Sequence, residues 1–344
     1  MSDLSVALHR TSAYIATSEE LQTVDLTTGE VRATARPRGS AKSSDVTKPV
    51  APLVVAGAGS TSVLAPFLVT EAGSGTQSAS TVLDVVSVSA QSGEEEWHTT
   101  IRLPQWAHTG LRVQPAVVAA GDGVVVVTVK SAYEVVSYGI DLATHQLRWT
   151  APGVTAGAVA AGSAVGWATE GQYSAAVGLA LTDGKEKWRG TPSWNVDLDP
   201  AGPSVVRTYA QGTSGGKGYD RLVKADTGEE VADLSGAGLR GARCSHDASE
   251  TLVCSNGSVI TGIDTTTGRV LWTLKDGQED GRNAPEISSV WHGRVYAKSE
   301  NGPVALDART GRDVPTRPEA APVLVNEFGG LVLDNGLQSY PAGG

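Results

Sequence analysis

A short segment made of two strands around a glycine turn recurs along the whole chain. Its clearest copies read ITGIDTTTGRVLW at residues 260–272 and VALDARTGRDV at residues 304–314. The seven copies have these turn residues: Gly29, Gly93, His145, Gly184, Gly228, Gly268 and Gly311. Their successive spacings are 64, 52, 39, 44, 40 and 43 residues. A period of about 40 residues with strands on both sides of a turn is typical of a β-propeller, in which each repeat forms one blade.

Short β-branched runs between Gly and Ser/Thr clusters extend each copy to four predicted strands. Copy three shows them at residues 114–118, 123–130, 134–141 and 147–150. The fourth strand of copy seven is predicted at residues 312–315, and residues 323–340 add three more strands after it. The total of 31 predicted strands is one fewer than eight four-stranded blades need. The last blade therefore either lacks its outermost strand or borrows one from residues 1–10. Seven blades would leave three strands over, and a propeller must close because open edges invite pairing.

We therefore predict an all-β fold, an eight-bladed β-propeller of four-stranded antiparallel blades, with a seven-bladed ring as the alternative. The repeat runs through residues 1–344, which favours a single domain. Two segments interrupt it, at residues 37–50 and 71–80, where Gly, Ser and Pro predict surface loops. Both loops are either tolerated insertions or contacts for a partner.

Four tryptophans stand four residues after a turn position. A tryptophan there can lie flat between neighbouring blades, with its indole N–H directed at one acceptor. We therefore interpret these residues as blade-packing residues: Trp97, Trp149, Trp188 and Trp272. An aspartate four residues before the turn recurs as well, and its carboxylate can accept backbone N–H bonds at the strand end.

Cys244 and Cys254 are the only two cysteines, in GARCSHDASETLVCSNG. The segment predicts a hairpin about Ser249, which places the two cysteines opposite each other at a distance that a disulfide can span. A structural disulfide predicts an oxidising, extracytoplasmic location, as a secreted protein or an ectodomain. If both thiols are reduced, the alternative is a cytoplasmic protein.

Charge and hydropathy exclude several classes of partner. The formal net charge of −10 argues against nucleic acid and against an anionic membrane surface. No apolar run is long enough to span a membrane, and the first residues, MSDLSVALHR, lack a signal-peptide pattern. Met1 is the only methionine, which fits a start codon added to an excised ectodomain; whether an anchor preceded it stays open, as does the oligomeric state.

The pattern ALDxxTGxxxW resembles the PQQ-like β-propeller repeat over essentially the whole chain. That family includes quinoprotein alcohol dehydrogenases and the non-catalytic propeller of the lipoprotein BamB. The dehydrogenases carry an adjacent Cys-Cys disulfide and long insertions around PQQ and Ca²⁺, and this chain has neither. The resemblance therefore implies a non-catalytic propeller without a cofactor. Low Lys and Met with abundant Ala, Gly, Val and Thr is typical of actinobacterial proteins, in which similar propellers occur as extracytoplasmic domains.

Unusual residues gather in the predicted connections between blades, which emerge on one face of a propeller. Exposed Trp and acidic residues on a rigid scaffold favour a binding surface. The candidate interaction residues are Trp106, His108, Trp194, Asp197, Asp199, Glu279 and Asp280. We expect a protein or cell-envelope partner there. A less favoured interpretation of the same residues is a Ca²⁺ site built from Asp197, Asp199 and Glu279 or Asp280.

No catalytic motif or zinc-ligand spacing is present, so we assign no catalytic, cofactor-binding or metal residues. The leading hypothesis is a non-catalytic, extracytoplasmic interaction or ligand-sensing module. A minimal PQQ-dependent quinoprotein oxidoreductase is the second hypothesis, and a cytoplasmic assembly scaffold is the third.

Overall fold

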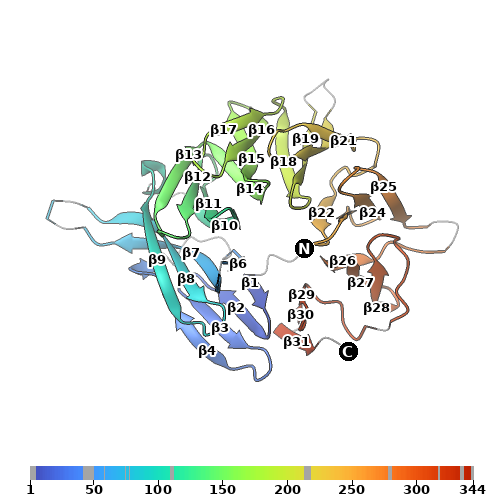
Figure 1. Ribbon diagram of the computed structural model, residues 1–344, viewed down its shortest axis with the longest axis horizontal. Coiled ribbons are helices and arrows are strands. Elements are labelled where there is room, and N and C mark those ends of the chain that lie inside the picture. Colours follow the sequence, from blue (N-terminus) through green and yellow to red (C-terminus); the bar gives the residue numbers. More distant parts are fainter. Residues whose placement is uncertain are drawn as a thin grey trace. The chain divides into compact units, whose positions relative to one another are not determined.

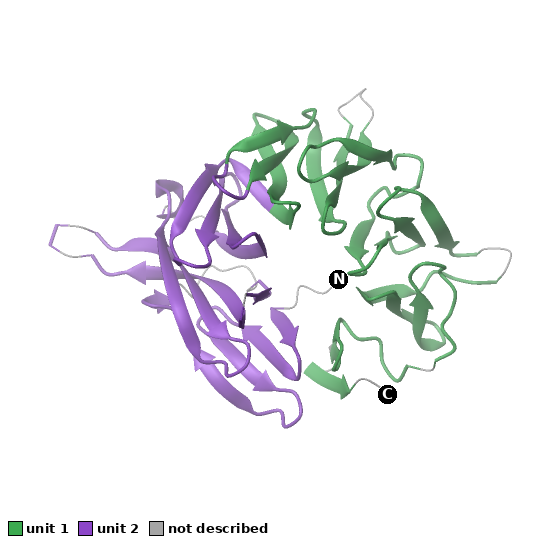
Figure 2. Cartoon of the chain, in the orientation of Figure 1, with its two compact units in different colours: residues 1–2, 157–180, 185–344 green, residues 3–156, 181–184 purple. Residues whose placement is uncertain are grey.

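The computed structural model describes residues 5–41, 50–57, 59–73, 75–76, 78–108, 112–212, 218–277, 281–316, 318–333 and 337–341. The chain folds as the predicted eight-bladed β-propeller of antiparallel sheets, so the seven-bladed alternative is wrong (Figure 1). The chain divides into two compact units (Figure 2). Unit 1 comprises residues 1–2, 157–180 and 185–344, and unit 2 comprises residues 3–156 and 181–184. The single-domain organisation of residues 1–344 stays a prediction.

Unit 2 contains blades 1 to 3. Blade 1 is formed by β1 (Val6–His9), β2 (Ser12–Ala16), β3 (Leu21–Asp25) and β4 (Val31–Ala35). Blade 2 is formed by β6 (Leu53–Ala56), β7 (Thr61–Glu71), β8 (Ser80–Ser89) and β9 (Glu95–Arg102), and the short β5 (Ser40–Ala41) pairs with β7. Blade 3 is formed by β10 (Gln114–Gly121), β11 (Val124–Lys130), β12 (Val135–Asp141) and β13 (Leu147–Pro152).

Blade 4 has residues in both units, and blades 5 to 8 lie in unit 1. Blade 4 is β14 (Val154–Ala160), β15 (Ser163–Glu170), β16 (Tyr173–Ala180) and β17 (Glu186–Arg189). Blade 5 is β18 (Trp194–Pro200), β19 (Val205–Gln211), β20 (Tyr219–Lys224) and β21 (Glu230–Asp233). Blade 6 is β22 (Arg243–His246), β23 (Thr251–Ser255), β24 (Val259–Asp264) and β25 (Val270–Lys275).

Blades 7 and 8 have three strands each among the described residues. Blade 7 is β26 (Glu286–Trp291), β27 (Arg294–Ser299) and β28 (Gly302–Asp307), and blade 8 is β29 (Leu324–Asn326), β30 (Gly329–Leu333) and β31 (Leu337–Pro341). The fourth strand of blade 7 predicted at residues 312–315 is wrong: only the bridge between Leu306 and Asp313 forms. After this bridge, Thr316 N donates to the Val314 carbonyl at 2.7 Å, so the chain turns away from β28 instead of continuing the ladder.

The core consists mainly of Val, Ala and Leu side chains between the sheets. In β11, Val124 to Val127 and Val129 have no exposed surface, because both faces of this strand are covered. Helical structure among the described residues is limited to the 3₁₀ turn η1 (Gln105–His108). No helix in that part of the chain is long and apolar enough to cross a membrane.

Candidate functional site

The repeat tryptophans join each blade to the next one. The indole Nε1 of Trp149 donates to the Leu181 carbonyl at 2.8 Å. Trp188 donates to Ala225 O at 2.9 Å, and Trp272 donates to Ala308 O at 2.8 Å. These acceptors follow the third strand of the next blade, so the bonds fix the spacing between neighbouring sheets. Trp97 instead stacks on the His145 ring, 4.6 Å between centroids and 11° between planes.

A complementary position on the third strand makes room for each indole. Trp149 lies directly opposite Gly139, and a Cβ on this glycine would overlap the indole. Gly178 and Gly262 face Trp188 and Trp272 in the same way. Where the fourth strand has alanine, the third strand has a larger residue: Thr23 faces Ala33, and Leu222 faces Ala232. Sequence reasoning missed this pairing, although its signal is a glycine two residues before the turn aspartate.

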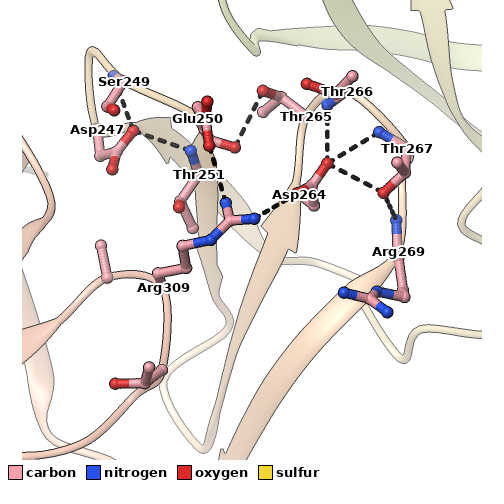
Figure 3. A network of polar contacts seen from close by, with 12 residues as sticks. Asp247, Ser249, Glu250, Thr251, Asp264, Thr265, Thr266, Thr267, Arg269 and Arg309 are labelled. Atoms are coloured by element: carbon pink, nitrogen blue, oxygen red, sulfur yellow. Dashed lines mark hydrogen bonds and ion pairs between the residues drawn. The ribbon is translucent and has the colours of Figure 1, made fainter.

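The turn aspartates accept backbone N–H groups, and one turn ties two blades together. Asp264 Oδ1 accepts the backbone N–H groups of Thr266 and Thr267 at 3.1 and 2.9 Å. Figure 3 shows Arg309, from the blade 7 turn, reaching both Glu250 and Asp264 of blade 6, each at 3.1 Å. This arrangement, in which exposed Arg309 and Glu250 meet the buried Asp264, joins two blades and has a structural role.

The two cysteines form a disulfide within blade 6. Cys244 on β22 and Cys254 on β23 are directly opposed in the ladder and bonded to each other. Both side chains are buried. The predicted disulfide is therefore present in the structure.

The strongest concentration of charge in unit 1 centres on Arg207 of β19, which is 1% exposed. Its guanidinium makes a bidentate pair with Asp220, at 2.8 and 2.6 Å, and a third bond to Asp199 Oδ2 at 2.7 Å. It also donates to the carbonyls of Leu239 and Ala242 at 3.2 and 3.0 Å. These carbonyls precede blade 6, so Arg207 links blades 5 and 6 through a fully hydrogen-bonded cation.

The strand register explains this cluster. Asp197 faces Tyr209 and Asp199 faces Arg207 across the β18–β19 ladder, so the four side chains share one face. Arg207 lies over the Tyr209 ring, 4.2 Å from its centroid. Burial raises the pKa of the Asp199 carboxyl to about 6, against the lowering effect of Arg207. Burial, with the charges of Asp199 and Asp197, also raises the pKa of Tyr209.

Beyond this cluster, β18 begins with an exposed aromatic residue. Trp194 is 40% exposed and packs edge-to-face against Tyr173 of blade 4, 6.2 Å between ring centroids. The ladder shifts register between Trp194 and Asp197, and Asn195 there has a left-handed φ of 48°. Such a bulge redirects side chains at the end of a strand.

Beneath Trp194, blades 4 and 5 are held together by backbone bonds. Ser174 N donates to Ser193 O at 2.9 Å, and Ser193 N donates to Ser174 O at 2.8 Å. The residue before Trp194 is therefore fixed at the junction of blades 4 and 5, which we call the seam, and Trp194 does not lie on a free loop. We call Tyr173, Trp194, Asn195 and Gln211, with Asp197 beside them, the Trp194 surface.

The structure changes the predicted setting of these residues. Trp194, Asp197 and Asp199 were expected in a connection at residues 191–200, but residues 194–200 form β18. Asp199 is also held by Arg207 and is not an open ligand. Val196 and Leu198, which alternate with the two aspartates along the chain, are buried, as expected for a strand.

The other predicted interaction residues lie elsewhere. Trp106 and His108 belong to η1 in unit 2, where Trp106 packs against a hydrophobic cluster. His108 Nδ1 accepts the Thr81 N–H at 3.0 Å, so His108 anchors the end of β8. Glu279 and Asp280 fall outside the described residues. The structure therefore brings Trp194, Asp197 and Asp199 together on one strand.

Among the described residues, the predicted acidic ligands do not assemble a Ca²⁺ site. The Asp199 carboxylate is paired with Arg207, and the described residues contain no group of three His, Cys, Asp or Glu side chains that could hold a metal ion. The disulfide joins two strands of one sheet.

We expect the stability of unit 1 to depend on the ionisation of Asp199. The folded-state pKa of Asp199, about 6, lies above the ordinary value of 3.8, so the folded state is favoured while this carboxyl is protonated. This stabilisation is fully present below about pH 4 and is lost as the pH rises through 6. Relative to Asp199→Asn, the wild-type protein should lose on the order of 2 kcal/mol of unfolding free energy over this range. Urea unfolding at several pH values measures this. Glu327→Gln, at an exposed carboxyl, is the control, and a pH-independent difference for Asp199→Asn would contradict the expectation.

Comparison with known proteins agrees with the repeat pattern. Residues 176–336 match the PQQ-like repeat family described as outer membrane protein assembly factor BamB. The predicted resemblance to PQQ-like propeller repeats is thereby confirmed. No curated protein matches the sequence.

Solved propellers of several kinds resemble the chain. The quinohemoprotein alcohol dehydrogenase ADHIIG from Pseudomonas putida HK5 has 11% identity and a TM-score of 0.47, over 91% of this chain and 66% of that enzyme. The dihydro-heme d1 dehydrogenase NirN has 13% identity and a TM-score of 0.47, over 90% of this chain and 66% of that one. The Dos1 propeller has 10% identity and a TM-score of 0.46, over 88% and 74%. The chain spans 66% of the length of either dehydrogenase.

Proposed function

We propose that this chain is a non-catalytic propeller that binds a partner protein outside the cytoplasm, with Trp194 as the anchor. The observation that carries the proposal is the exposure of Trp194 on a seam fixed by backbone hydrogen bonds. Tryptophan is enriched among residues that dominate binding energy, and a rigid anchor loses little conformational entropy on binding. The edge-to-face contact with Tyr173 holds the indole in place before a partner arrives.

The extracytoplasmic location is supported by the disulfide between Cys244 and Cys254, because buried disulfides persist in oxidising compartments. The clusters around Arg207 and Arg309 are closed networks of mutual contacts, which favours a structural role for their charges. These features support an interaction module over an oxidoreductase and over a cytoplasmic scaffold. A source in an actinobacterial cell envelope remains part of the same proposal.

The test is photo-crosslinking in the organism that makes the protein. A benzoylphenylalanine at Gln211, the ladder partner of Trp194, should form a discrete adduct with one protein species. Trp194→Ala in the same chain should reduce the adduct at least tenfold, because a central anchor contributes about 2 kcal/mol or more. Trp194→Phe should retain most of it.

The matched control places the crosslinker at Tyr133, which is 84% exposed in unit 2. An adduct that forms equally at Tyr133, or that forms unchanged in Trp194→Ala, would contradict the proposal that Trp194 anchors the partner. Absence of any adduct at Gln211 would remove the Trp194 surface as a protein-binding site.

A further inference from the structure

A second surface feature lies in blade 7, away from the Trp194 surface. A cavity of about 610 Å³ opens between the connection that leads from blade 6 into β26 and the β27–β28 hairpin. This volume lies within the roughly 300–1,000 Å³ range of small-molecule sites. Blade 7 ends at β28 without a fourth strand among the described residues, so the outer part of this blade is left open.

The walls of the cavity are braced by their own hydrogen bonds. On one side, Asp276 Oδ1 accepts the Ala284 N–H at 2.9 Å, and Asn283 Oδ1 accepts the Gly277 N–H at 3.2 Å. On the other side, Ser299 Oγ donates to Gly302 O at 2.9 Å. The cavity is therefore formed before any ligand binds, which lowers the cost of binding.

Arg282 crosses the cavity wall and is held at its far end. Its Nη2 donates to Gly311 O at 2.9 Å and to Asp313 Oδ1 at 2.7 Å. The Asp313 carboxylate thus offsets the Arg282 charge. Among its described residues, the lining then contains two cations, Arg282 and Lys298, and three carboxylates, at Asp276, Glu300 and Asp313. This balance disfavours an anionic ligand such as phosphate, which would meet an excess of negative charge.

The remaining lining offers hydrogen-bond donors and acceptors side by side over a small apolar floor. Lys298 supplies an ammonium, Glu300 a carboxylate, and Asn301 an amide that both donates and accepts. None of these three side chains makes an ion pair or hydrogen bond within the described part of the chain. Val304 and Leu306 form apolar lining on β28. A hydroxyl group can match both kinds of partner, because it donates one bond and accepts two.

We infer that this cavity binds a small neutral polyhydroxylated ligand, a saccharide of one or two rings. Its hydroxyls bond to Glu300, Asn301 and Lys298, and its C–H surface lies on Val304. This site is independent of the Trp194 surface, and its ligand is independent of the proposed protein partner. An apolar ligand would leave the charged groups desolvated and unpaired, which costs more than it gains.

Saturation-transfer NMR with the whole chain tests this. The probes are D-glucose, D-galactose, N-acetyl-D-glucosamine and trehalose at concentrations of about 10 mM, which is enough to detect a dissociation constant of about 1 mM, a binding free energy of about −4 kcal/mol. At least one probe should show transfer from the protein. Glu300→Gln and Asn301→Ala should each weaken it at least fivefold. Asn256→Ala, at an exposed turn asparagine of blade 6, is the matched control and should leave it unchanged.

Two results would overturn the inference. One is the absence of transfer from all four saccharides, and the other is transfer that Glu300→Gln and Asn301→Ala leave intact. Binding of acetate or inorganic phosphate at this cavity with no saccharide binding would also overturn it, in favour of an anion site. Trp194→Ala should retain saccharide binding, so failure of the protein-binding proposal would be seen separately.

Discussion

Arg207→Met should destabilise the protein by about 3–5 kcal/mol, the range for removing one partner of a buried ion pair. The methionine fills similar volume but leaves the carboxylates of Asp199 and Asp220 without their cation. The carbonyls of Leu239 and Ala242 lose their donor as well, and each unsatisfied buried acceptor adds to the cost. Chemical unfolding at pH 7 measures the change.

Two further variants separate charge from geometry. Arg207→Lys keeps the cation but cannot make the bidentate pair with Asp220, so it should lose an intermediate amount, about 1–3 kcal/mol. Arg221→Met removes a neighbouring arginine that is 45% exposed and paired with Glu230, and it should cost less than about 1 kcal/mol. If Arg207→Met and Arg221→Met are equally mild, Arg207 does not hold blades 5 and 6 together.

The repeat was enough to predict the fold, because the same turn residues recur between the third and fourth strands of the repeated blades. A turn glycine at a positive φ and an aspartate four residues earlier are both local requirements, and they recur: Gly268 has a φ of 68°, and Asp264 caps its turn. His145 replaces glycine in blade 3, adopts a φ of 57° and stacks on Trp97. Such signals depend on neighbouring residues only, so they can be recognised in the sequence without knowledge of tertiary contacts.

The two errors of sequence interpretation arose where neighbouring residues alone do not determine whether a strand forms. Residues 191–200 contain two prolines and two aspartates, a composition typical of a connection, yet pairing with β19 makes residues 194–200 a strand. In blade 7, ARTGRDV carries the turn signal, but only the bridge between Leu306 and Asp313 follows the turn. The chain then leaves the sheet at a tight turn in which Thr316 N donates to Val314 O. Pairing with β19 decided the first case, and the tight turn between Val314 and Thr316 decided the second.

The polar cluster was only half visible in the sequence. Asp197 and Asp199 drew attention as acidic residues of a predicted connection between blades, and the structure places them on one face of β18. Arg207 did not, since one arginine in VVRTYAQ reads as an exposed position of an amphipathic strand. Its burial follows from the β18–β19 register and from the carbonyls before blade 6, which join residues far apart in the chain.

Trp149→Ala and Gly139→Leu should each destabilise the protein by about 3–5 kcal/mol, by opposite routes. The alanine leaves a cavity where a buried indole, 6% exposed, bonded to Leu181 O. The leucine occupies the space of that indole, because even a Cβ at residue 139 overlaps it, and forces Trp149 out of the seam. Thermal or urea unfolding of unit 2 reports both losses.

The double variant Gly139→Leu with Trp149→Ala installs the large–small pair that blade 5 carries as Leu222 and Ala232. If the two positions compensate each other in volume, the double variant should be more stable than the sum of the single losses predicts, by about 2 kcal/mol, at the upper part of the range for residues in contact. Recovery should be incomplete, since Gly184 of the next blade packs against the Trp149 indole and would face a gap. The matched control combines Gly139→Leu with Trp188→Ala, a tryptophan of another seam. Its two losses should simply add, and equal recovery in both double variants would show that no specific pairing exists.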